Sequence, residues 1–166
     1  MNYFQIDAVR TKIDQAFSKL ERPDLRPILT LGCCAEHDED FDWYRHHRWR
    51  ELPQEILTGW LDSIEFSALH PLAYHYFVPG ILAATLESVG KDIDWYSFGG
   101  KDWLINLLPD EERAEDFRRD YLSQFSPPEI DAVASHLELF QQAVVQQRGY
   151  PDEDLTRAIN SIWKRN

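Results

Sequence analysis

Cys34 and His37 are the residues at short spacing with the clearest chemical potential, because a thiol and an imidazole stand two residues apart in Cys-Ala-Glu-His. This spacing is typical of one half of a zinc site. A structural zinc needs four ligands, and no second Cys-x-x-Cys or His-x3-His pair follows in the chain. Two interpretations stay open: zinc bound with help from nearby carboxylates or histidines, or a loop with a buried thiol, which we favour.

A run of acidic residues follows directly and ends at two aromatic side chains. The residues are Glu36, Asp38, Glu39, Asp40 and Asp42, followed by Trp43 and Tyr44. Carboxylates beside aromatic rings combine long-range steering with apolar anchors, which is the composition of a docking surface. A solvated entry to a helix explains the same run, since acids are favoured at helix N-termini.

His70, His75, Tyr76 and Pro79 form a third candidate site, in the most apolar stretch of the chain. His70 and His75 stand about one and a half helical turns apart, so they do not share a face as a metal pair would. Pro79 removes the N–H that would pair with the carbonyl of His75, which predicts a kink or break near Phe77–Gly80. A pocket at this kink is one interpretation, and a satisfied core histidine is the one we favour.

The elements that would position these residues are helical. Apolar side chains between Pro71 and Leu86 fall at every helical angle, which predicts a helix with neighbours on all sides. Amphipathic stripes predict further helices over residues 6–20, after Pro53, after Pro109, from Ser126 to Gly149 and after Pro151. The sequence therefore predicts an all-α fold, a single domain over residues 1–166 with about six to seven helices around a central proline-kinked helix.

Charge and composition narrow the range of partners. The chain carries 29 acidic against 17 basic residues, a formal net charge of −12. Nucleic acids and anionic membranes repel such a chain, so a basic protein is the expected partner, and both a monomer and a homodimer are compatible with the sequence. Adjacent Cys33 and Cys34 favour free thiols, and no signal peptide is visible at the start, so we expect a cytoplasmic protein.

Three segments resemble a family of small bacterial proteins of unknown function. They are residues 49–53 (Trp-Arg-Glu-Leu-Pro), residues 69–79 (Leu-His-Pro-Leu-Ala-Tyr-His-Tyr-Phe-Val-Pro) and residues 125–130 (Phe-Ser-Pro-Pro-Glu-Ile). The Ala-x-x-Tyr-x-x-Pro spacing of Ala73, Tyr76 and Pro79 is the most specific part, and the likeness covers about Ile6 to Phe140. The resemblance implies one all-helical domain. It implies no activity, because the family has none assigned.

These observations favour a non-catalytic, acidic interaction module of the immunity or antitoxin kind, whose basic partner would be a toxin. The chain contains no nucleophile elbow, phosphate loop or dinucleotide-binding glycine motif. The alternative is a metal-dependent hydrolase or a zinc-stabilised domain built on Cys34, His37 and nearby carboxylates.

Overall fold

The computed structural model describes residues 3–24, 46–51, 69–89, 107 and 114–164. Helices make up most of these segments and no β-strand occurs in them, which confirms the predicted all-α class. The number of helices and the single domain stay predictions, because several predicted helices lie partly or wholly outside these segments. The described elements are α1 (Tyr3–Ala16), the 3-10 turn η2 (Trp49–Glu51), α4 (Pro71–Val89), α6 (Ala114–Asp120), the 3-10 turn η4 (Leu122–Gln124), α7 (Pro127–Arg148), α8 (Glu153–Ala158) and the π-helical turn η5 (Ile159–Trp163).

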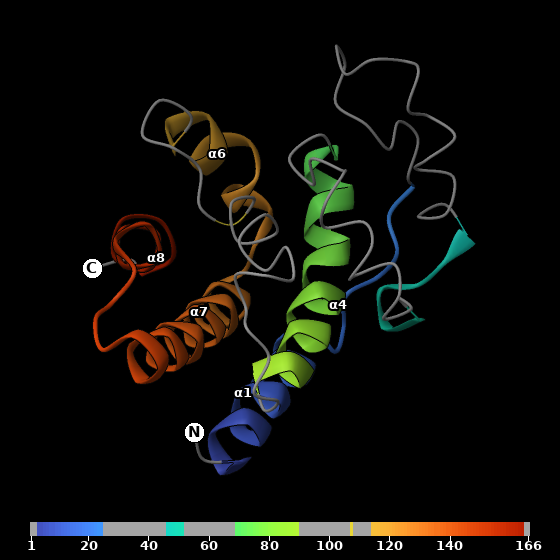
Figure 1. The fold of residues 1–166 in the computed structure, drawn as a ribbon. Coiled ribbons are helices and arrows are strands. Elements are labelled where there is room, and N and C mark those ends of the chain that lie inside the picture. Colours follow the sequence, from blue (N-terminus) through green and yellow to red (C-terminus); the bar gives the residue numbers. More distant parts are fainter. Residues whose placement is uncertain (1–2, 25–45, 52–68, 90–106, 108–113, 165–166) are drawn as a thin grey trace.

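Helix α4 begins where the sequence predicts and continues further than the sequence predicts. Pro71 occupies the first position, and His70 Nδ1 accepts a long hydrogen bond of 3.4 Å from the backbone N–H of Leu72. Pro79 lies inside the helix, which Figure 1 shows as one continuous element from Pro71 to Val89. Of the predicted kink or break, the break is therefore wrong, while the kink stays a prediction. Proline removes one backbone hydrogen bond, while the flanking turns keep theirs and are held by buried side chains.

Most described side chains of α4 are buried, which agrees with its predicted position in the core. The helix contacts α1, α7, η2 and η4, and α7 in turn contacts α8 and η5 (Figure 1). Among the described residues of α4, Leu72 is a large apolar side chain that is exposed to solvent, at 42%. Aromatic rings fill much of the space between α4 and its neighbours. The ring of Tyr74 on α4 makes edge contacts with three other aromatic rings, those of Phe117, Tyr121 and Phe125.

Helix α7 follows its local sequence signals closely. Ser126 is the N-cap, Pro127 is the first helical residue, and the carboxylate of Glu129 accepts the backbone N–H of Ser126 at 2.7 Å. At the other end Gly149 adopts φ of +81°, a left-handed conformation that suits a residue without a Cβ atom. The predicted helix from Ser126 to Gly149 is thus confirmed.

The C-terminal segment departs from regular α-helix after one and a half turns. Asp152 caps α8 by accepting the N–H of Leu155. The N–H of Lys164 then bonds to the carbonyl of Ile159 at 2.7 Å, a five-residue spacing that defines the π turn η5. This turn buries Trp163, whose indole N–H donates to the carbonyl of Leu107 at 2.8 Å.

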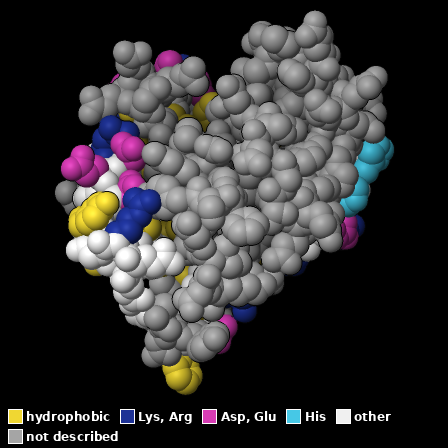
Figure 2. Space-filling view, viewed as in Figure 1, with side chains coloured by type: hydrophobic (Ala, Val, Ile, Leu, Met, Phe, Trp, Pro, Cys, Tyr) yellow, Lys and Arg dark blue, Asp and Glu magenta, His cyan; other side chains and the backbone are white. Residues whose placement is uncertain are grey.

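Charged side chains of both signs lie on the described surface over α7 and α8, at the left of Figure 2. Arg157 pairs with Asp154 along α8, and Arg118 pairs with Glu115 along α6. Within the described ranges, no helix is both long enough and apolar enough to cross a membrane.

Candidate functional site

Two of the three predicted sites fall on residues that the structure does not describe. Cys34 and His37 lie outside the described ranges, and so does the whole acidic run with its aromatic end, namely Glu36, Asp38, Glu39, Asp40, Asp42, Trp43 and Tyr44. These assignments stay predictions.

The residues of the third site lie on α4 and its cap, but their side chains serve different contacts. His70 is at the start of the helix and caps it. Tyr76 is 3% exposed and packs edge-on against Phe77, with ring centroids 4.9 Å apart. Pro79 is buried within the helix. Of the four, His75 is the one that faces a charged side chain of another described residue.

His75 meets the N-terminus of α7. Its Nε2 atom lies 3.2 Å from Oε1 of Glu129, and the two side chains are only 13% and 10% exposed. The two atoms stand within ion-pair distance, and among the described residues the Nε2 atom has no well-directed hydrogen bond. The edge of Phe125 and the ring of Phe17 enclose the imidazole at centroid distances of 4.6 and 6.2 Å. His75 is thus mostly buried, but its Nε2 atom has no hydrogen-bond partner among the described residues, so the satisfied core histidine stays a prediction.

Glu129 joins two helices through its two carboxylate oxygens. Oε2 accepts both the backbone N–H and the hydroxyl of Ser126, at 2.7 and 2.8 Å, while Oε1 faces His75. Burial acts to raise the pKa of Glu129, but the contact with His75 and the two bonds from Ser126 outweigh it and lower the pKa. The carboxylate is therefore ionised at neutral pH.

The order of these three side chains does not suit nucleophilic catalysis. A serine nucleophile needs the imidazole as its direct proton acceptor, with the carboxylate behind the imidazole. Here Glu129 stands between Ser126 and His75, so the hydroxyl of Ser126 donates to a carboxylate that already caps a helix. The arrangement fastens the N-terminus of α7 to α4.

A second histidine, His136, is fully buried between α4 and α7. Its Nε2 atom lies 3.1 Å from the hydroxyl of Thr85, which itself donates to the carbonyl of Ile81 at 2.8 Å or of Leu82 at 3.0 Å. Because the hydroxyl has one proton and uses it on a carbonyl, the ring must donate from Nε2. Burial lowers the pKa of His136 to about 3, so the ring is neutral.

Metal ligands do not gather in the part of the chain that is described. No three His, Cys, Asp or Glu side chains of those segments stand close enough to hold an ion together. His70 and His75 each have a contact of their own.

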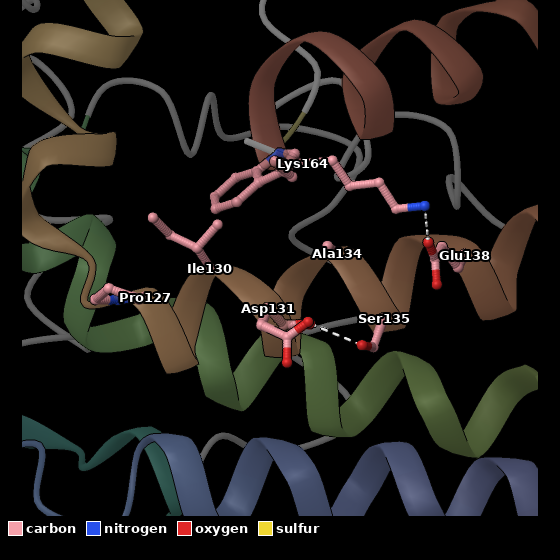
Figure 3. A pocket seen from close by; sticks show the side chains of 8 residues that line it. Pro127, Ile130, Asp131, Ala134, Ser135, Glu138 and Lys164 are labelled. Atoms are coloured by element: carbon pink, nitrogen blue, oxygen red, sulfur yellow. Dashed lines mark hydrogen bonds and ion pairs between the residues drawn. The ribbon is translucent and has the colours of Figure 1, made fainter. Parts of the chain in front are cut away.

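A groove lies between the first half of α7 and the π turn η5, and we call it the α7–η5 groove. Its volume is about 250 Å³. Figure 3 shows that Pro127, Ile130 and Ala134 lie along α7 beside Asp131, Ser135 and Glu138, with Lys164 reaching across to Glu138. Trp163 completes the lining. The groove thus has an apolar floor and a charged rim.

Sequence reasoning missed the partners of His75 and His136 and the whole groove. Ser126 and Glu129 carried a capping-box signal, but nothing in it pointed to His75 on another helix. The lining residues of the groove on α7 repeat at three- and four-residue steps, which marks one helical face without showing what lies opposite.

The ion pairs at the rim are exposed. Lys12 of α1 contacts Oδ2 of Asp131 at 2.6 Å, and Lys164 contacts Oε1 of Glu138 at 2.5 Å. Lys12 also donates to the hydroxyl of Ser135 at 2.7 Å. Asp131 is 66% exposed and Glu138 39% exposed, so both carboxylates face solvent.

Comparison of the chain with protein-family models, with curated proteins and with solved structures finds no match, so the family resemblance stays a prediction.

Proposed function

We propose that this chain is a non-catalytic, acidic interaction module that binds a basic protein partner, of the kind found in immunity proteins and antitoxins. The observation that carries the proposal is the formal net charge of −12 in 166 residues. Such a field accelerates encounter with a positively charged protein and repels acidic competitors.

The acidic run that ends at Trp43 and Tyr44 is the proposed docking surface. Its five carboxylates would steer the partner, and the two aromatic side chains would supply the apolar anchor that carries most of the binding energy in protein interfaces. Steering of this kind weakens with salt, because the screening length falls from about 10 Å at 0.1 M to about 3 Å at 1 M.

The test compares two charge-reversal variants of equal net charge. One replaces Asp38, Glu39, Asp40 and Asp42 by lysine. The control replaces four acids on the exposed faces of α6 and α8 by lysine, namely Glu115, Asp116, Glu153 and Asp154. Each is used as bait beside the unmodified chain in cells of the source organism, and the association rate of each captured protein is measured against salt.

We expect the unmodified chain and the control to retain one basic protein, the docking variant to lose it, and the association rate to fall steeply with salt. The antitoxin interpretation adds that expressing the captured protein alone stops growth and that co-expressing this chain restores it. Capture of no basic protein, or equal capture by all three baits, contradicts the proposal.

The spacing of Cys34 and His37 favours a second candidate, a metal-dependent hydrolase or a zinc-stabilised domain. Elemental analysis of protein purified without added metal separates the two functions. Stoichiometric zinc, iron or manganese that the double variant Cys34→Ala/His37→Ala no longer carries, with a lower melting temperature in chelator, supports the metal site. Protein free of metal, with unchanged melting, removes it.

A further inference from the structure

We draw no further inference here: the strongest candidate, the α7–η5 groove, has both of its rim carboxylates, Asp131 and Glu138, already paired with lysines, and nothing in the described part of the structure shows what covers it.

Discussion

His136 should make the stability of this protein depend on pH between neutral and mildly acidic conditions. The ring is 0% exposed, donates to Thr85, and packs on Phe140 with centroids 4.9 Å apart. Burial lowers its pKa to about 3, while in the unfolded chain it is near the ordinary 6.5. Between these values the unfolded chain binds a proton that the folded chain excludes, so the free energy of unfolding falls as the pH falls.

The size of the effect follows from the two pKa values. Each pH unit inside the window removes about 1.4 kcal/mol from the free energy of unfolding. From about pH 6.5 to about pH 5 the loss attributable to His136 is therefore about 2 kcal/mol, against a total of about 5 to 15 kcal/mol for an ordinary domain. Above the unfolded pKa the contribution is complete and further alkali adds nothing.

Urea unfolding, followed by circular dichroism at about pH 7 and about pH 5, measures this difference. His136→Gln removes the titration, so its free energy of unfolding should fall by about 2 kcal/mol less over the same interval. His70→Gln at the partly exposed start of α4 is the control and should keep the dependence that His136 causes. An NMR titration of the His136 ring with a midpoint near 6, or a His136→Gln variant with unchanged pH dependence, refutes the reasoning.

Two further predictions concern the ends of α7. Glu129→Ala removes the cap and the charge facing His75 and should lower the free energy of unfolding by about 2 kcal/mol. Glu129→Gln keeps an acceptor for Ser126 and should cost about half as much; equal losses in urea unfolding would contradict the double role of the carboxylate. Gly149→Ala should cost about 1 kcal/mol from backbone strain alone, because a Cβ atom there meets no heavy atom within 4 Å. Gly149→Asn should cost less than Gly149→Ala, and a thermal melt that ranks the two variants the other way rejects strain as the cause.

The parts of the fold that the sequence predicted well are those with local causes. Ser126, Pro127 and Glu129 mark the start of α7, and Gly149 marks its end, so the boundaries follow from backbone chemistry within one turn. Apolar residues at every helical angle of α4 likewise predicted a buried helix. The break at Pro79 was wrong because packing around the helix outweighs one missing hydrogen bond.

The parts that escaped prediction depend on residues far apart in the chain. The contact between His75 and Glu129 joins two helices, and Trp163 reaches a carbonyl 56 residues away. Periodicity describes one helix at a time, so it cannot show which faces meet. The π turn η5 has no local signature, and the groove exists only because that turn stands opposite α7.

The two oxygens of Glu129 also bear on how the chain folds. One oxygen completes the first turn of α7 and the other meets α4, so local helix formation and long-range assembly share a single ionised group. If α4 departs, the first turn of α7 loses the neighbour of its capping carboxylate, and if that turn frays, His75 loses the charge beside it. Opening at this corner should therefore proceed as one cooperative event, in which hydrogen exchange of the first α7 amides and of the α4 amides around His75 speeds up together.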